Sequence, residues 1–390
     1  MTQVTNILRC YGEIYDANVI KGSGCYVYDD QGNKYVDFEA GVWSAALGHG
    51  HPKVNAALHQ QIDQIMHLGY RYHNPMVDEA SQVLLETLGF ASGKCIFLSS
   101  GSEAMEFGVQ IVRRMTNRPL LLALSGSYLG AYGSAGKRDT AEWCLFDWRE
   151  CAACTKTCDR NCQRMAAIPF DQIAGFVFEP GNSSGLVLLP PTSLIRAIER
   201  KVKEQGGLVV ANEVTTGLGR TGEWFGYDHY GLRPDIVALG KHIGNGYPVS
   251  AVVIKEALGV RIERENYRYA QSHQNDALGC AVASTVIKTI KEEGLIARSR
   301  EMGRVFRERL VGLKGRHKCI SEVRGRGLML AIQLVHISPE VVQRELFRRG
   351  FLVGLSQLAG VLRFYPPLTI RIEDIDNLIE ALDDLLTSND

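Results

Sequence analysis

Short apolar runs alternate with helix-length amphipathic stretches between residues 94 and 239 of this chain. The runs are almost continuously apolar, which is typical of parallel strands buried on both faces. They comprise residues 94–99, 119–124, 174–178, 207–211 and 235–239. The amphipathic stretches between them have helical spacing, for example 103–114 and 192–204. This alternation predicts an α/β fold, in which a parallel sheet carries helices on both faces and binds its ligand at the carboxyl ends of the strands.

The two ends of the chain have a different pattern. Residues 24–37 contain two alternating apolar stretches around a polar turn at 30–33, which indicates a β-hairpin. Beyond about residue 285, a charged helix is expected over 288–306, and strand-like segments follow near 327–335 and 361–365.

These patterns divide the chain into three parts. We expect a large domain over residues 49–285 and a smaller α+β domain over 286–390. The N-terminal segment, 1–48, is expected to pack with the smaller domain.

The charges of the chain are balanced, with 43 lysines and arginines against 43 aspartates and glutamates. A protein that binds nucleic acid usually has a basic excess, and one that binds a membrane surface a basic face. Neither partner is therefore favoured, and we expect a small-molecule substrate.

The N-terminal residues lack the basic and apolar pattern of a signal peptide, and no apolar run approaches the roughly 18 residues of a membrane span. Ten cysteines in such a chain are expected to be reduced thiols. We therefore expect a cytoplasmic protein.

Small and polar residues follow three of the predicted strands. Residues 99–103 form a polar turn that opens a helix, and the free N–H groups and dipole of a helix start suit a phosphate. A polar and glycine-rich loop, 211–222, follows another strand. Lys241 comes at the end of a third strand, where apolar walls would remove water from its amine and make it nucleophilic.

The segments 24–38, 46–52, 212–248 and 363–368 resemble those of the class III (omega-amino-acid) aminotransferases, which are enzymes of pyridoxal phosphate fold type I. The resemblance covers nearly the whole chain and is most specific over 212–248. It implies a large cofactor-binding domain with a mostly parallel sheet flanked by helices, and a smaller α+β domain.

The resemblance also implies pyridoxal 5'-phosphate as cofactor, with a Schiff base at Lys241. Gly101 and Ser102 would hold the phosphate, and Tyr128 would stack on the pyridine ring. Ser272 matches a hydroxyl that contacts the phosphate from the partner subunit. The resemblance therefore implies a homodimer with shared active sites.

The implied activity moves an amino group between an amino acid or amine and a keto acid, with Lys241 as the general base and acid. Asn212 stands where the family has an aspartate that keeps the pyridine nitrogen protonated. An amide has no negative charge, so the cofactor should be a weaker electron sink unless Glu213 or another carboxylate compensates. Two alternatives stay open for this reason: an amino-acid racemase or epimerase, and a non-catalytic relative that binds the cofactor.

The expected substrate-binding residues also depart from part of the family. The ornithine and acetylornithine branch has an arginine at the position of Ala131 and a glutamate, which masks a C-terminal arginine, at the position of Ser184. Ornithine-type substrates are therefore disfavoured. Arg363 matches the C-terminal arginine and would bind a substrate carboxylate bidentately, with Trp43 beside it. The alternatives are a structural ion pair for Arg363 and a core position for Trp43.

Five of the ten cysteines lie within residues 144–162. The spacing of Cys151, Cys154, Cys158 and Cys162 fits one face of a helix, but a straight helix would place the first and last about 16 Å apart, too far to share one metal ion. A zinc or iron–sulfur site in a segment that folds back, reduced thiols, and disulfides formed on oxidation are the three alternatives. No metal ligand is assigned from the sequence.

Overall fold

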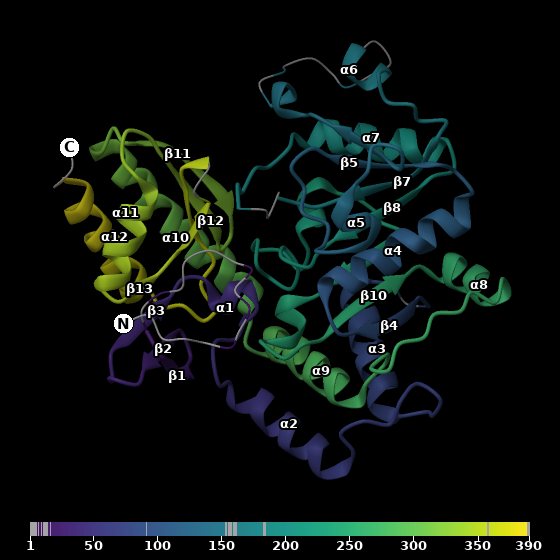
Figure 1. Cartoon of the computed structure of the whole chain (residues 1–390), viewed down its shortest axis with the longest axis horizontal. Helices are drawn as coiled ribbons and strands as arrows, with labels where there is room; N and C mark the ends of the chain where they lie inside the picture. The colour runs from purple at the N-terminus through teal and green to yellow at the C-terminus, as the bar shows by residue number, and fades with distance from the viewer. Residues whose placement is uncertain are drawn as a thin grey trace.

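Figure 1 shows the chain as a computed structural model, which describes residues 6, 8, 10, 15, 17–90, 92–152, 154, 158, 162–181, 185–356 and 359–387. A seven-stranded central sheet forms the middle of its larger part. In spatial order the strands are β4 (Lys94–Leu98), β10 (Ser250–Ile254), β9 (Ile236–Leu239), β8 (Leu208–Asn212), β7 (Ile173–Phe178), β5 (Leu120–Leu124) and β6 (Trp143–Phe146). β10 is antiparallel to both of its neighbours and the other pairs are parallel, which confirms the mostly parallel sheet. The five predicted strands are present with ends within one residue of those expected, and β6 and β10 were not predicted.

Helices cover both faces of the central sheet, as predicted. Helix α4 (Gly101–Thr116) contacts β7 to β10 on one face, and α7 (Thr192–Glu204) contacts β7 and β8 on the other. Within β5, Leu121 and Ala123 join the cluster around α4, whereas Leu122 and Leu124 join the cluster that includes α7. The strands are apolar at successive positions because both of their faces are buried.

The predicted helix over 288–306 is wrong. Helix α9 (Ala277–Glu292) ends inside that range, and α10 (Leu295–Arg316) begins after two intervening residues. The break lies at Gly294, whose φ of 61° is in the left-handed region that glycine adopts without strain. α9 packs beside α2 (Pro52–Gln64) and α3 (Pro75–Leu88), as Figure 1 shows below the central sheet.

The shorter helical elements are α1 (Ala40–Trp43), α5 (Gly133–Lys137), α6 (Gln163–Ala166), α8 (Glu256–Arg264), η1 (Arg149–Cys151), η2 (Gly226–Tyr230) and η3 (Lys241–Gly244).

Two smaller sheets of four strands each contain the other eight strands of the described residues. The antiparallel C-terminal sheet consists, in order, of β11 (Ile320–Arg326), β12 (Met329–Leu334), β15 (Val361–Phe364) and β14 (Gly354–Ser356). It packs with α10 and α11 (Pro339–Arg348), and both of these helices contact α12 (Ile372–Thr387).

The N-terminal sheet contains the predicted hairpin. It is formed by β1 (Val19–Ser23), β2 (Tyr26–Asp29), β3 (Lys34–Asp37) and β13 (Phe351–Leu352). The parallel pairing of β13 with β3 places N-terminal residues beside C-terminal ones. The domain boundaries at residues 48 and 285 themselves stay a prediction.

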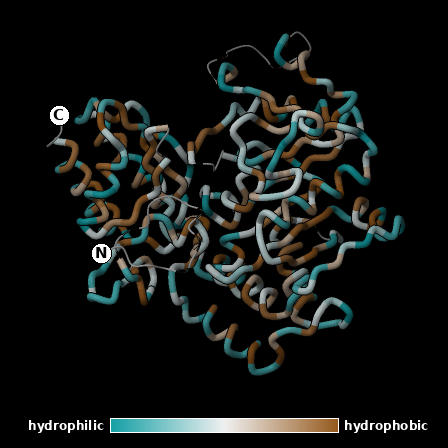
Figure 2. The backbone as a smooth tube through the Cα atoms, in the orientation of Figure 1, coloured by the Kyte–Doolittle hydropathy of each residue, from teal (hydrophilic) through white to brown (hydrophobic). Residues whose placement is uncertain are grey.

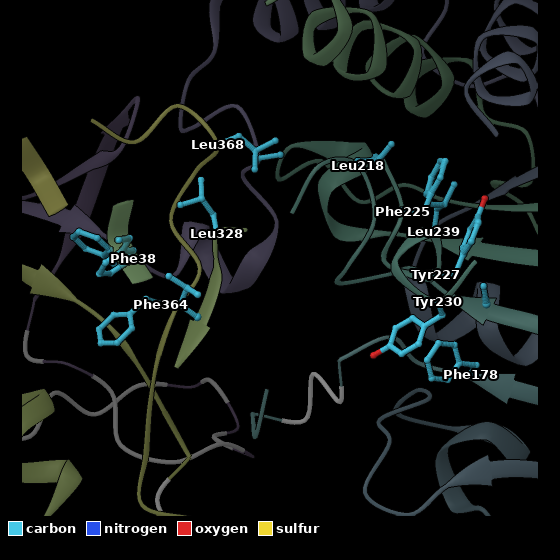
Figure 3. Packing of buried hydrophobic residues seen from close by; sticks show 14 of the residues in the cluster. Phe38, Phe178, Leu218, Phe225, Tyr227, Tyr230, Leu239, Leu328, Phe364 and Leu368 are labelled. Atoms are coloured by element: carbon cyan, nitrogen blue, oxygen red, sulfur yellow. The ribbon is translucent and has the colours of Figure 1, made fainter. Parts of the chain in front are cut away.

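The buried core runs without interruption from the C-terminal sheet to the central sheet. One cluster includes Phe38 and Phe364 at one end and Phe178 and Tyr230 at the other, and Figure 3 shows these side chains on both sides of the glycine-rich loop that contains Leu218. Figure 2 shows hydrophobic segments in the interior of both parts and hydrophilic segments along much of the outline. Among the described residues, no helix is long and apolar enough to cross a membrane.

The buried guanidinium of Arg220 connects the glycine-rich loop to the C-terminal part of the chain. Its side chain is fully buried and donates hydrogen bonds to the carbonyl oxygens of Leu328, at 2.9 Å, and Pro366. It also donates to His242 Nε2 at 3.0 Å, and His242 Nδ1 in turn lies 3.0 Å from the carbonyl oxygen of Gly217. Burial lowers the pKa of Arg220 to about 9 and also lowers that of His242, beside the cationic arginine. The loop and the start of η3 are therefore held to the C-terminal sheet by groups that cannot reach water.

Candidate active site

Three polar side chains meet at the carboxyl ends of adjacent central strands. Glu179 directly follows β7, Asn212 ends β8, and Lys241 follows β9 after one glycine. Glu179 Oε2 accepts a hydrogen bond from the backbone N–H of Tyr128 at 2.9 Å, and Asn212 Nδ2 donates to the carbonyl oxygen of the same residue at 3.0 Å. The edge of the sheet at which the sequence predicts a ligand is therefore where the structure gathers these groups.

Lys241 lies in a tight apolar setting. Its Nζ atom donates to Thr215 Oγ1 at 2.8 Å and lies 4.6 Å from the centre of the Trp43 ring. Burial lowers the pKa of the amine to about 8, although Glu179 opposes this shift and Arg363 adds to it. A lysine with this pKa is partly uncharged near neutral pH, and only the uncharged amine is a nucleophile or a base.

The start of α4 forms a close backbone cradle beside the lysine. Ser100 caps the helix, with its Oγ accepting from the N–H of Glu103 at 3.2 Å. A Cβ atom on Gly101 would lie 2.5 Å from Val214 Cγ1, so the site accepts no side chain there. Ser102 Oγ accepts from the N–H of Ala131 at 3.0 Å and holds the loop that follows Tyr128. A helix start at which a closely packed glycine leaves the backbone N–H groups accessible is suited to an anion.

Both ends of the Asn212 side-chain amide form hydrogen bonds with neighbouring backbone groups. Its Oδ1 accepts from the N–H of Val214 at 3.2 Å while its Nδ2 donates to Tyr128, which leaves one amide N–H available to a ligand. Glu213 is already occupied, because its carboxylate binds Thr216, Gly226 and Tyr227 at 2.8 Å each. Burial raises the pKa of Glu213 to about 8. Glu213 therefore holds the turn at η2, and the compensating role considered for it has no support in these contacts.

Trp43 is placed by a left-handed turn. All four residues of α1 have positive φ, including 58° at Val42 and 67° at Trp43. This conformation costs roughly 1–2 kcal/mol for each residue with a Cβ atom. The carboxylate of Asp37 stabilises the turn by accepting from the N–H groups of Glu39 and Gly41, at 2.8 and 2.9 Å, and lies 2.7 Å from His49 Nε2.

Trp43 and Arg363 lie side by side, and each has a buried N–H donor. The centre of the Arg363 guanidinium lies 4.8 Å from the Trp43 ring, which itself packs edge-on against Tyr365. Trp43 Nε1 and Arg363 Nε are buried and make no hydrogen bond of normal length to any residue that the structure describes, although the carboxylate of Glu39 interacts with both side chains. A substrate carboxylate bound by these donors would therefore compete with Glu39.

Arg363 has a carboxylate neighbour that the sequence did not indicate. Its Nη2 atom donates to the carbonyl oxygen of Leu355 at 3.0 Å and lies 3.7 Å from Glu39 Oε1. Burial raises the pKa of Glu39, although Arg363 opposes the shift. The position expected to hold a masking acid, Ser184, lies outside the described residues.

Ser272 lies apart from these groups, in the loop before α9, with its side chain exposed. The site residues not expected from the sequence are Glu39, Glu179 and Thr215. Glu179 and Thr215 each follow a predicted strand closely, and that position is the signal that could have identified them. Nothing in the sequence near Glu39 indicates that it approaches Arg363.

At the described residues of the cysteine segment, Cys154, Cys158 and Cys162 are not helical. Turn η1 ends at Cys151, and Cys162 has an extended backbone before α6. None of the ten cysteines, all of which lie in described positions, forms a disulfide. Within the described part of the chain, Cys151, Cys154, Cys158 and Cys162 do not bring three ligand atoms within 4.8 Å of one another.

Comparisons with known proteins identify relatives of this chain. A family model described as "Aminotransferase class-III" matches residues 10–135 and 146–386. An acetylornithine aminotransferase from Caldanaerobacter subterraneus subsp. tengcongensis is 30% identical over 381 residues, which cover 96% of this chain and 95% of the relative. Another, from Methanosarcina mazei, is 31% identical over 93% of this chain and 90% of the relative.

Solved structures have the same fold. An S-selective transaminase from Arthrobacter sp. superposes with a TM-score of 0.90 at 23% identity, covering 98% of this chain and 96% of that one. The acetylornithine aminotransferase from Elizabethkingia anophelis gives 0.84 at 25% identity, with the same coverage of both chains.

The strain at Val42 leads to a testable prediction. Because its side chain is 63% exposed and its φ is positive, Val42→Gly should raise the free energy of unfolding by about 1 kcal/mol in urea denaturation. Val341→Gly is the matched control: this valine is also exposed but lies in helix α11, where glycine should lower the free energy of unfolding by about 0.5 kcal/mol. A loss of stability in both variants would contradict the strained turn.

Proposed function

Because this chain belongs to the class III aminotransferases and is a pyridoxal-phosphate-dependent transaminase, we propose that Lys241 is its catalytic residue and that Arg363 and Trp43 bind the substrate carboxylate. The observation that carries the proposal is the amine of Lys241, which lies at a strand end between Thr215 and Trp43 with its pKa lowered by burial. The two alternative functions, a racemase or epimerase and a non-catalytic relative, are less well supported, since the relatives and structures named above are aminotransferases or transaminases.

The residues at the strand ends fit the cofactor. Gly101 and Ser102 would hold the phosphate at the start of α4, where no side chain fits, and Tyr128 would lie against the ring. When bound, pyridoxal phosphate supplies an aldehyde that condenses with amines and a ring that stabilises negative charge on the substrate carbon. We place Ser272 of the partner subunit at the same phosphate.

Asn212 would face the ring nitrogen with its one remaining N–H donor. Such a donor pairs with an unprotonated nitrogen, so the ring withdraws electrons less strongly than one held beside a carboxylate. An aspartate at this position would place a carboxylate oxygen against the carbonyl oxygen of Tyr128, to which Nδ2 now donates at 3.0 Å. The amide therefore suits both the backbone of this chain and a neutral ring nitrogen.

Lys241 would move the proton that amino transfer requires. Its uncharged amine would accept a proton from the substrate carbon at Nζ and would then donate that proton to the carbon to which the amino group is transferred. Thr215 Oγ1 holds the amine in place. The Trp43 ring lies 4.6 Å from the amine and forms part of the surroundings that bury it, and burial lowers its pKa to about 8. Arg363 and the indole N–H of Trp43 would orient the amino acid or keto acid through its carboxylate.

A homodimer in the cytoplasm completes the proposal. The connection between α2 and α3 exposes Met66, Tyr70 and Tyr72, and Tyr128 and Tyr132 are exposed near the site. Exposed aromatic and methionine side chains in such numbers are typical of a surface that a partner covers.

The absence of disulfides among the ten cysteines, all at described positions, suits a reducing compartment.

The role of Lys241 can be tested against a second lysine, the half-buried Lys255. Lys241→Ala should lower the rate of amino transfer by about 10³-fold or more, because both the nucleophile and the base are lost. Lys255→Ala is the matched control, since burial also lowers the pKa of Lys255 but its amine lies 3.7 Å from Asp235, away from the site. Borohydride treatment should fix the cofactor to the peptide that contains Lys241 in the control but not in Lys241→Ala. Turnover retained in Lys241→Ala would refute the assignment.

The carboxylate role of Arg363 can be tested by the choice of substrate. Arg363→Leu should raise KM about tenfold or more for amino acids and keto acids, because a charge-assisted pair is lost, and should leave KM for simple amines within about twofold. Glu39→Gln should lower KM for the same acids several-fold, since it removes the negative neighbour 3.7 Å from Arg363. Equal effects of Arg363→Leu on acids and amines would show that the arginine is structural.

A further inference from the structure

A network of hydrogen bonds joins the loop before α9 to the phosphate cradle of the same chain. The loop lies between α8 and α9 and contains Ser272. Within it, Tyr269 Oη donates to Glu103 Oε1 at 2.6 Å. Gln271 Nε2 donates to Ser99 Oγ at 3.2 Å. Two residues of the loop are therefore bound to the turn that opens α4.

The carboxylate of Glu103 is the centre of this network. Besides Tyr269, it binds the backbone N–H of Ser99, at 3.0 Å from Oε2, and Gln271 Nε2 at 3.4 Å. It lies in the first turn of α4, where a negative charge interacts favourably with the helix dipole. A carboxylate accepts stronger hydrogen bonds than a neutral group does. One charged group therefore holds both the turn and the loop.

The other end of the loop is held by Asn275. Its backbone N–H donates to the carbonyl oxygen of Phe97 in β4, and its Oδ1 accepts from the N–H of Phe97, each at 2.9 Å. Its φ of 54° lies in the left-handed region, which asparagine adopts more readily than most residues. Ser272 therefore lies between two attached residues, and both attachments lead to the segment that carries the phosphate cradle.

Two tyrosines of the loop bind different parts of α4. The ring of Tyr269 packs edge-on against Phe107, with 4.9 Å between ring centres, and the ring of Tyr267 does so at 6.1 Å. The hydroxyl of Tyr267, however, donates to Gln110 at 3.1 Å, about two helical turns beyond Glu103. The two tyrosines thus share an apolar contact, but only the hydroxyl of Tyr269 reaches the start of the helix.

We propose that Tyr269 and Glu103 are positioning residues for the partner's active site, because they hold the loop that presents Ser272 to the phosphate bound by the other subunit. The inference rests on the proposed function, which places Ser272 at that phosphate. A hydroxyl on a loop that is already held loses less conformational freedom when it binds than one on a free loop. The phosphate cradle of each subunit therefore supports the phosphate site of the other.

Hybrid dimers, purified through two different tags, separate an effect on the partner's site from one on the chain's own site. In the first hybrid, a chain with Lys241→Ala and Tyr269→Phe pairs with a wild-type chain. The site that keeps Lys241 then takes its Ser272 from the chain without the Tyr269 hydroxyl. In the second hybrid, Lys241→Ala and Tyr269→Phe are on different chains, so that site takes its Ser272 from a loop with the hydroxyl.

The measurement is the dissociation constant of pyridoxal 5'-phosphate, from the absorbance of the lysine-bound cofactor. The reference is a Lys241→Ala chain paired with a wild-type chain. The first hybrid should bind the cofactor about fivefold more weakly than the reference, because a hydrogen bond that holds the loop is lost. Glu103→Gln in place of Tyr269→Phe should act in the same direction. The second hybrid should match the reference.

Tyr267→Phe is the matched control in the first hybrid, since it removes a hydroxyl from the same loop at the far end of the contact with α4. It should leave the dissociation constant unchanged. The proposal is overturned if the first hybrid binds like the reference, or if the second hybrid is weakened, which would show that Tyr269 serves its own chain's cradle.

Ser272→Ala in place of Tyr269→Phe in the first hybrid tests the premise. A weaker affinity with Ser272→Ala but not with Tyr269→Phe would show that this inference alone is wrong. An unchanged affinity with Ser272→Ala would show that the proposed function places Ser272 incorrectly, and the inference would then fail with it.

Discussion

The buried guanidinium of Arg220 is the constraint on which the arrangement of the site depends. A charged group without access to water is tolerated only when its donors are satisfied, and here the acceptors come from separate parts of the chain. Leu328 and Pro366 belong to the C-terminal part, and His242 directly follows Lys241. Since Pro366 lies three residues beyond Arg363, the same hydrogen bonds set the proposed substrate-binding arginine relative to the lysine.

Backbone strain and burial of charged groups occur together at the proposed active site. The left-handed turn at α1 places Trp43 between Lys241 and Arg363, and Lys241 itself has a positive φ of 45°. Such conformations persist only where surrounding contacts determine them, as the Asp37 carboxylate does for the turn. Trp43 therefore lies between a partly uncharged amine and the pair formed by Arg363 and Glu39.

Short-range patterns predicted much of the fold and missed particular features. The central strands were predictable because burial on both faces makes them apolar throughout, as in β5. The break between α9 and α10 was missed because one glycine, Gly294, interrupts an otherwise continuous charged helical pattern. A metal site on the cysteines would require their segment to turn back on itself. The spacing of the cysteines could not decide this, since spacing alone does not show where a backbone turns.

The sequence by itself indicated the family and the cofactor, and it placed Lys241, the proposed catalytic residue, at the end of a strand, because these inferences rest on motifs of residues close together in the chain. Only the tertiary structure decided that Glu39 lies beside Arg363, that Glu213 is occupied by the η2 turn, and that His67 reaches Asp276. The first and last of these pairs join residues more than two hundred positions apart. No local pattern specifies such contacts, since they arise only when separate elements pack and their buried charges must find partners.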